Sequence, residues 1–214
     1  IMGLVGVIWY KTISERFPGK HHKIFADNKN IVQIKTDQLL KSGVEHVFIS
    51  TNDTNVQNTD KVTYIKRDEK YCNNTLKYPL ILKEIFDSIP VSENQDTVIT
   101  FSCCPLFSRY DEMYDEYLKS NTNQIAVHPS THFYLDVNKR PINFNFGMWH
   151  SVSQDIDPVY LFPYAGTMCK MKDLLEVYYV IPINFNYFNI NQFEAIDIDY
   201  EEEFRVAQEV YKWM

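Results

Sequence analysis

The amino-acid sequence predicts an α/β fold with a mostly parallel sheet and helices on both of its faces. Short apolar segments alternate with longer segments in which apolar residues recur at helical spacing. Polar stretches follow several of the apolar segments, at the strand ends where open parallel sheets bind ligands. The chain has 214 residues, of which 45% are apolar. That length and composition predict a single globular domain over residues 1–214.

In residues 1–65, short apolar segments that predict strands alternate with a segment of helical periodicity. Residues 1–10 are largely apolar but too short to span a bilayer, which takes ~20 residues, so they predict a buried first strand. A polar loop ending in Pro18-Gly19 comes next, and the first helical pattern stops before Gly43. The predicted elements are strands at 5–9, 47–49 and 62–65 and a helix at 30–41.

The pattern continues through the middle of the chain. The second helical pattern is followed by Pro90, which cannot continue a helix. The predicted elements here are helices at 76–89 and 110–119 and strands at 97–101 and 125–127.

Helical periodicity fades between residues 128 and 190, where aromatic residues, Asn and Pro dominate. Two apolar segments flank Asn138-Lys139-Arg140 and predict a hairpin of residues 133–137 and 141–146. We therefore expect an inserted β-rich lobe at residues 129–165. The chain then returns to pattern, with a strand predicted at 194–198 and a helix at 200–212, whose first-turn glutamates suit the helix dipole.

Composition excludes several functions. The formal net charge is −7, which argues against a broad nucleic-acid-binding face, and no apolar run is long enough to be a membrane span. Only six residues are glycine, and neither the Walker nor the dinucleotide-binding glycine motif is present. The four cysteines include no Cys-x-x-Cys pair, which favours a reduced, cytoplasmic protein over a zinc site or a disulfide framework.

A cluster of cations directly follows the first predicted strand. Lys11, Ser14, Arg16 and Lys20 lie within ten residues that contain Pro18-Gly19. Lys and Arg donors offset the charge of a nucleoside triphosphate, and a Pro-Gly turn aims backbone amides and Lys20 at such a ligand. From composition alone, a solvated surface loop is an equally good interpretation.

Two acids stand close together near the C-terminus. Asp197 and Asp199 would point to the same side of a strand, and their mutual repulsion favours a cation beside them. Mg²⁺ prefers a few carboxylates together with phosphate oxygens and water. The alternative is that Asp199 caps the final helix.

These segments resemble the cytidylyltransferases of 2-keto-3-deoxy acid sugars, the sialic acid (N-acylneuraminate) and KDO enzymes. The stretch from Val7 to Lys20 is similar to their opening motif, with Lys11 in place of the usual arginine. Further similarities follow in order along nearly the whole chain: V-F-I-S-T-N-D at 47–53, Arg67, Cys104-Pro105-Leu106, Gln154 through Tyr160, Gly166, and the acidic stretch 195–204.

The resemblance implies a Rossmann-like fold and a nucleotidyltransferase that transfers CMP from CTP to an acid sugar. It implies that Lys11, Ser14, Arg16, Lys20 and Arg67 bind the nucleotide, and that Asp197 and Asp199 hold Mg²⁺. Lys11, Arg16, Lys20 and Asp199 would be catalytic, and Gln154 and Tyr160 would contact the sugar. The lobe at 129–165 would mediate a homodimer, and no nucleic acid or membrane partner is implied.

The sequence also departs from the family pattern. His21 replaces an asparagine, Phe101 a glutamine, Cys103 a metal-binding aspartate of the KDO enzymes, and Phe107 an arginine, while Val152 and Ser153 replace basic residues. Because Phe101 cannot hydrogen-bond a sugar or a base, the acceptor is an unusual acid sugar or the site is degenerate. Two alternatives therefore stay open: a non-catalytic homologue that binds a nucleotide or a partner, and a glycosyltransferase of the related nucleotide-sugar fold.

Overall fold

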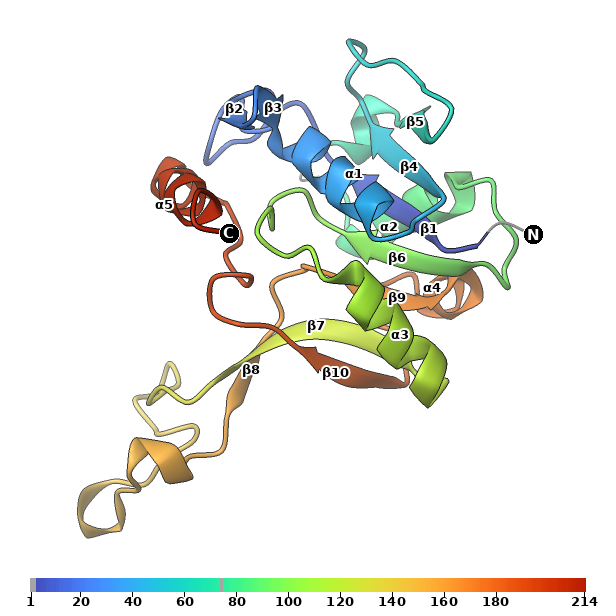
Figure 1. The fold of residues 1–214 in the computed structure, drawn as a ribbon. Coiled ribbons are helices and arrows are strands. Elements are labelled where there is room, and N and C mark those ends of the chain that lie inside the picture. The colour runs from blue at the N-terminus through green and yellow to red at the C-terminus, as the bar shows by residue number, and fades with distance from the viewer. Residues whose placement is uncertain (1–2, 74) are drawn as a thin grey trace.

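A large mixed sheet forms the centre of the molecule (Figure 1). The computed structural model describes residues 3–73 and 75–214, so the first two residues of the apolar segment 1–10 lie outside it. The eight strands of this sheet follow the order β10-β7-β9-β6-β1-β4-β5, with β8 paired to β7. Their bounds are β1 (Val5–Trp9), β4 (His46–Thr51), β5 (Val62–Lys66), β6 (Asp96–Thr100), β7 (Asn123–Ser130), β8 (Val159–Leu161), β9 (Thr167–Lys170) and β10 (Phe185–Asn189).

The sheet is parallel where β1 pairs with β4 and β6, where β4 pairs with β5, and where β10 pairs with β7. The strands β9 and β8 are antiparallel to their neighbours. A separate two-stranded pair comprises β2 (Ile24–Ala26) and β3 (Lys29–Asn30). The mostly parallel sheet predicted from the alternation of segments is confirmed.

Helices cover both faces of the sheet, as predicted. One apolar cluster joins the sheet to α1 and α3, and a second joins it to α2 and α4. A third cluster packs α5 beside α1 and the loop after β1. The helices are α1 (Ile31–Lys41), α2 (Tyr78–Ser88), α3 (Tyr110–Ser120), α4 (Met171–Val177) and α5 (Glu201–Tyr211). None of them is long and apolar enough to cross a membrane.

Local chemistry sets where the first two helices begin. Asn30 and Gln33 form a reciprocal capping box, in which the Asn30 side chain accepts from the Gln33 amide at 2.9 Å and the Gln33 side chain from the Asn30 amide at 3.0 Å. The helix α2 starts at Tyr78, two residues later than predicted. The reason is Pro79, which fits the first turn because the amide it lacks has no intrahelical partner there.

The second half of the chain departs from the sequence predictions in three places. The strand predicted at 194–198 is wrong: a turn at 192–195 leads into irregular chain, because Asn191 and the buried Glu194, paired with Arg109 at 2.8 Å, bend the chain there. The hairpin predicted at 133–137 and 141–146 is confirmed only around its turn, by the bridge between Leu135 and Pro141 and two flanking backbone hydrogen bonds of 2.8 and 2.9 Å. The helix α4 and the strands β9 and β10 were not predicted.

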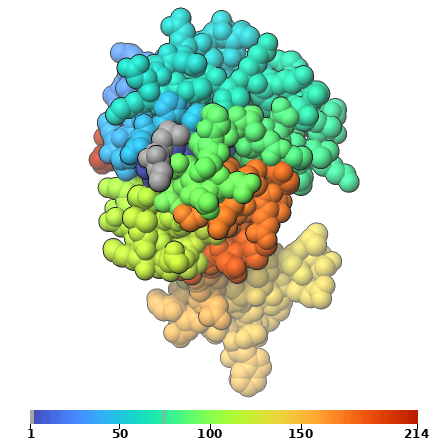
Figure 2. All heavy atoms as spheres, turned by 90° about the vertical axis from the view of Figure 1, so that its right-hand side faces the viewer, coloured from blue at the N-terminus to red at the C-terminus, as the bar shows by residue number. Residues whose placement is uncertain are grey.

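The lobe at 129–165 projects away from the body of the molecule (Figures 1 and 2). Its β structure is limited to the pairing of β7 with β8 and the single bridge, and two short 3₁₀ helices, Gly147–Trp149 and Ser153–Asp155, lie between them. With little sheet to cover them, several large apolar side chains of the lobe stay exposed. The lobe is thus less β-rich than its apolar alternation predicts.

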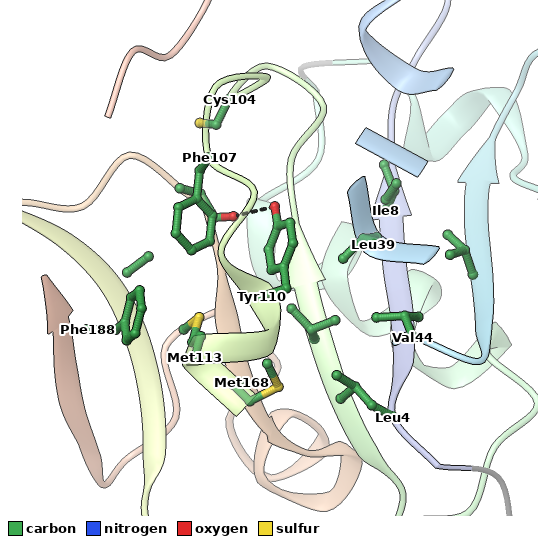
Figure 3. Close-up of a cluster of buried hydrophobic side chains, with 14 of the residues drawn as sticks. Leu4, Ile8, Leu39, Val44, Cys104, Phe107, Tyr110, Met113, Met168 and Phe188 are labelled. Carbon is green, nitrogen blue, oxygen red and sulfur yellow. Dashed lines mark hydrogen bonds between the residues drawn. The ribbon is translucent and has the colours of Figure 1, made fainter. Parts of the chain in front are cut away.

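A lysine lies inside the first apolar cluster. Phe107, Tyr110, Met113 and Phe188 pack between α3 and the sheet (Figure 3). Beside them, the fully buried Lys35 donates to the Phe107 carbonyl at 2.6 Å and to the Tyr110 hydroxyl at 2.9 Å. Phe107 therefore belongs to the core, and its backbone rather than its side chain makes a polar contact.

Burial lowers the pKa of Lys35 from 10.5 to about 7, against the opposing influence of Cys104 and Cys103. The unfolded chain therefore binds more protons than the folded chain between pH 7 and 10.5, and the contribution of Lys35 to stability rises with pH across that window. We predict that the free energy of unfolding of the wild type, minus that of Lys35→Met, increases by a few kcal/mol from pH 7 to about 9.5, at ~1.4 kcal/mol per pKa unit.

Both proteins share the buried cysteines and tyrosines. Subtracting one free energy of unfolding from the other therefore cancels the contribution that the ionisation of these groups makes to the pH dependence. Urea unfolding at each pH measures it. Lys41→Met, on an exposed lysine of the same helix, is the control and should show no trend. A difference for Lys35→Met that stays constant with pH would contradict the prediction.

Candidate functional site

A cavity of about 580 Å³ opens at the carboxyl ends of the central strands. Segments after β1, β5 and β6 line it together with the start of α2, Tyr164 and the C-terminal acidic stretch. The cavity brings together the seven residues that the sequence analysis assigned to the nucleotide or the metal ion: Lys11, Ser14, Arg16, Lys20, Arg67, Asp197 and Asp199. Gln154 and Tyr160 do not line it; they lie on the lobe, where the Tyr160 ring packs against Tyr187 at 4.4 Å.

The loop after β1 is held in a tight turn. Gly19 has a φ of 74°, which favours glycine, and its carbonyl accepts from the amides of His22 and Lys23 at 2.9 and 3.1 Å. The buried ring of Phe17 packs edge-on against Phe204 of α5, with ring centroids 5.4 Å apart. The turn and this anchor together direct Lys20 inward.

Lys20 links the loop to the C-terminal stretch. Lys20 is only 6% exposed. Its ammonium donates to the Ile198 carbonyl at 2.7 Å and to Cys103 Sγ at 3.4 Å. Two exposed contacts lie nearby: both terminal nitrogens of Arg16 contact the Asp199 carboxylate at 2.6 Å, and Lys23 pairs with Glu201 at 2.8 Å. We call these three contacts the loop clasp.

Arg67 approaches the cavity from the end of β5. The residue is 4% exposed; it donates from Nη2 to the Tyr10 carbonyl at 2.7 Å and from Nε to Cys72 Sγ at 3.2 Å. Within the part of the chain that the structure describes, its third nitrogen, Nη1, is buried without a hydrogen-bond partner. An unpaired buried donor is unfavourable by about 1–3 kcal/mol, so an acceptor from a ligand would improve this site.

The acid pair is partly neutralised by the loop. Burial and the charge of Asp199 raise the pKa of Asp197 to about 6, while Lys20 acts in the opposite direction. Asp199 does not cap α5: the N-cap residue is Tyr200, and Glu203 Oε2 accepts from the amides of Asp199 and Tyr200 at 2.6 and 2.9 Å. Asp199 is thus left to face Arg16.

No group of three or more His, Cys, Asp or Glu side chains is arranged to hold a metal ion within the described residues. The cavity offers the two carboxylates of Asp197 and Asp199. Hard oxygen donors in small number suit Mg²⁺, which keeps several waters and completes its octahedron with substrate phosphates. The donor set therefore fits Mg²⁺ as part of a phosphate complex rather than as a resident structural ion.

His21 is a packing residue. Its ring lies 5.0 Å from that of Tyr10, and Nδ1 is 3.3 Å from Ser102 Oγ. Burial and the charge of Lys20 lower its pKa to about 3, so the imidazole stays neutral at neutral pH. His21 therefore adds no positive charge to the cavity.

The polar stretch after β4 supports the basic loop from behind. Asn52 accepts from the Thr12 amide and donates to the Thr12 hydroxyl, both at 3.0 Å, and the Tyr10 hydroxyl donates to Asp53 at 3.0 Å. Sequence reasoning placed this stretch at a strand end but gave it no role. The available signals were its position after a buried strand and the similarity of residues 47–53 to the family motif.

Four aromatic residues also line the cavity, namely Trp9, Tyr78, Phe101 and Tyr164, and we call these four residues the aromatic wall. Sequence reasoning noted Phe101 as a departure from the family pattern and missed the other three. The ring of Phe101 lies 4.5 Å from that of Trp9 and 4.8 Å from that of Tyr164, in edge-to-face contacts. The cavity thus combines charged groups with a cluster of aromatic rings.

Comparisons with known proteins extend the description of the fold. No protein-family model matches the sequence, and no curated protein matches it. Solved structures do match, among them CMP:2-keto-3-deoxy-manno-octonic acid synthetase complexed with CTP, with a TM-score of 0.68 and 13% identity over 99% of each chain.

Two further matches are 4-diphosphocytidyl-2C-methyl-D-erythritol synthase from Anaerococcus prevotii and 2-C-methyl-D-erythritol 4-phosphate cytidylyltransferase from Francisella tularensis. Each has a TM-score of 0.67 over 99% of both chains, at 11% and 10% identity. At such identities the likeness establishes the fold, which is the Rossmann-like α/β fold that these nucleotidyltransferases share. It leaves the chemistry to be argued from the residues of this chain.

The contacts of the loop clasp predict unequal effects on stability. Lys20→Met leaves the buried Ile198 carbonyl without its donor and should lower the free energy of unfolding by about 1–3 kcal/mol. Arg16→Ala removes an exposed ion pair and should lower it by about 1 kcal/mol or less. Urea unfolding of both variants tests the ranking, and an Arg16→Ala effect larger than that of Lys20→Met would contradict it.

Proposed function

We propose that this chain is a nucleotidyltransferase that transfers CMP from CTP to an acid sugar and releases pyrophosphate. The observation that carries the proposal is the meeting, in one cavity, of four cations with the acid pair Asp197 and Asp199. A triphosphate needs several positive charges, and its metal ion needs carboxylates. The solved structures of similar fold support the choice of CTP, because all three are named for cytidylyl chemistry and one was solved with CTP.

Some of the cations keep their partners in the protein when a ligand binds, and another would exchange its carboxylate partner for a phosphate. Lys20 is held at the Ile198 carbonyl and at Cys103, which leaves one of its three ammonium protons for a phosphate oxygen. Arg67 keeps Nη1 for a ligand acceptor. Arg16 is bound to Asp199 on the surface side of the cavity, and a phosphate would take the place of that carboxylate. Ser14 and Lys11 also line the cavity.

The reaction needs positioning more than covalent help. A hydroxyl oxygen of the acid sugar attacks the α-phosphorus in line, the bond from that phosphorus to the pyrophosphate oxygen breaks, and the hydroxyl proton passes to solvent water. Lys20, Arg16 and Arg67 orient the phosphates and offset the charge that moves to the leaving group. Mg²⁺, held by Asp197 and Asp199 when bound, supplies further neutralisation of that charge. Neither Cys103 nor Cys104 takes part as a nucleophile.

Pyrophosphate release tests this proposal directly. The protein is mixed with CTP, Mg²⁺ and a panel of 2-keto-3-deoxy acid sugars, and we expect turnover with at least one of them. Lys20→Met and Asp197→Ala should each lower kcat/KM by about 100-fold or more, as for other losses of a charge-stabilising group. Lys61→Ala, on an exposed lysine away from the cavity, is the matched control and should leave kcat/KM unchanged.

Two results together would overturn the proposal: no acid sugar gives pyrophosphate, and Asp197→Ala leaves the affinity for CTP in Mg²⁺ unchanged. CTP binding without turnover would instead favour the non-catalytic homologue. Circular dichroism of each variant confirms that a loss of activity is not a loss of fold.

We propose further that the chain forms a homodimer through the lobe at 129–165. Val137, Met148 and Trp149 are each more than three-quarters exposed there, although burying them would be favourable. Gln154 and Tyr160 lie on the same lobe, away from the cavity of their own chain. If they contact the sugar, they do so in the cavity of a second copy.

Trp149→Glu should convert the dimer to a monomer, because a carboxylate cannot be buried unpaired in an apolar contact. Trp213→Glu places the same change on an equally exposed tryptophan outside the lobe, just after α5, and should leave the dimer intact. Sedimentation velocity distinguishes the two states. Equal sedimentation coefficients for wild type and Trp149→Glu would contradict the lobe as the interface.

A further inference from the structure

The aromatic wall is assembled from four segments that are distant in sequence. Trp9 ends β1, Tyr78 begins α2, Phe101 follows β6, and Tyr164 precedes β9. The Phe101 amide donates to the Tyr164 carbonyl at 3.2 Å, and this hydrogen bond fixes the positions of Phe101 and Tyr164 relative to each other. The ring of Phe162 packs behind Tyr164, with centroids 4.7 Å apart. The wall is therefore built on backbone contacts and ring packing, and not on one mobile loop.

The polar atoms of the wall already have partners within the protein. The Trp9 indole N–H donates to the Tyr78 hydroxyl, and the Tyr164 hydroxyl is hydrogen-bonded with Tyr179. Burial raises the pKa of Tyr78 above its ordinary value, and burial, Tyr179 and the charge of Asp197 raise that of Tyr164 to about 12. Both phenols thus stay neutral, and the wall presents ring carbons to the cavity.

The order of the strands separates part of the wall from Arg67. Arg67 follows β5, on the β4 side of β1, whereas Phe101 follows β6 and Tyr164 precedes β9, on the other side of β1; Trp9 ends β1 itself, and Tyr78 begins α2, which follows β5. Asp197 and Tyr164 line the same cavity, and the charge of Asp197 acts on Tyr164. A nucleotide held by Arg67 and the basic loop would therefore leave the part of the cavity at Phe101 and Tyr164 to the acceptor.

We propose that the aromatic wall is the acceptor subsite, and that Phe101 selects an acid sugar whose face toward it is deoxygenated, with C–H or methyl groups where other acid sugars carry a hydroxyl. This inference rests on the proposed cytidylyltransfer. A hydroxyl against Phe101 loses its hydrogen bonds to water without replacement, whereas a C–H or methyl group gains apolar contact.

Matched pairs of acceptors test the inference. Each pair shares the 2-keto-3-deoxy acid end and differs by the replacement of one hydroxyl with hydrogen, for example N-acetylneuraminate and its terminally deoxygenated derivative. With saturating CTP and Mg²⁺, we expect the deoxygenated member of at least one pair to have a kcat/KM about tenfold higher or more, as for other apolar pockets. Phe101→Gln should abolish or reverse that preference, and Phe101→Leu should retain it.

Further variants separate recognition from folding. Phe101→Tyr keeps the ring and adds a hydroxyl, so it should shift the preference toward the hydroxylated member even if Phe101→Gln is unstable. Phe193→Gln, on a phenylalanine outside the cavity, should leave the ratio unchanged. The affinity for CTP, measured by calorimetry, should stay within about twofold for every Phe101 variant. A large loss of CTP affinity would place Phe101 at the base instead and overturn the inference.

The outcomes distinguish this inference from the proposed function. Turnover that favours the hydroxylated acids, or a ratio that Phe101→Gln does not change, overturns the inference and leaves the proposed function standing. CTP binding without turnover of any pair also overturns it. Failure of both CTP binding and turnover removes the proposed function, and the acceptor subsite with it.

Discussion

The contact between Lys20 and the Ile198 carbonyl is the constraint on which the rest of the site depends. It joins the loop after the first strand to the stretch before the last helix, across 178 residues of sequence. Because the ammonium is buried, it must keep its partners, so the loop and the C-terminal stretch hold each other in place. The cations of the loop and the acids of the stretch consequently share one cavity instead of facing water separately.

The order of the strands brings charged groups and aromatic rings to the same cavity. The strand β1 lies between β4 and β6, so its carboxyl end is the point where both neighbours deliver their loops. Groups after β4 and β5 position the basic loop and Arg67, and groups after β6 and before β9 bring aromatic rings. A ligand with a strongly charged part and a less polar part therefore fits this cavity better than one that is charged throughout.

Local patterns predicted what depends on local physics. The buried strand at Val5–Trp9, the helix after Asn30 and the cations after the first strand follow from apolar runs, capping residues and chain order. The aromatic wall could not be predicted in this way, since Trp9, Phe101 and Tyr164 meet only through the tertiary fold. The strand expected at 194–198 was wrong for a related reason: the ion pair of Glu194 with Arg109 is a long-range contact that overrides local propensity. The exposed apolar residues of the lobe misled the strand prediction because their alternation with polar residues mimics that of a half-buried strand.

Although the net charge of the chain is −7, the charges at the cavity include ion pairs that a ligand could exchange. Arg16 and Asp199 neutralise each other without a ligand, so neither charge is left unpaired. In the proposed function, a phosphate that approaches Arg16 would free Asp199, and the freed carboxylate, beside Asp197, would then favour the cation that accompanies the phosphate. Because this exchange would replace one ion pair by two, the proposal implies that the anionic nucleotide and its cation bind better together than apart. An acidic chain would thus bind an anion without a large excess of positive charge, since the cation that enters with the ligand would compensate for the carboxylates that the exchange exposes.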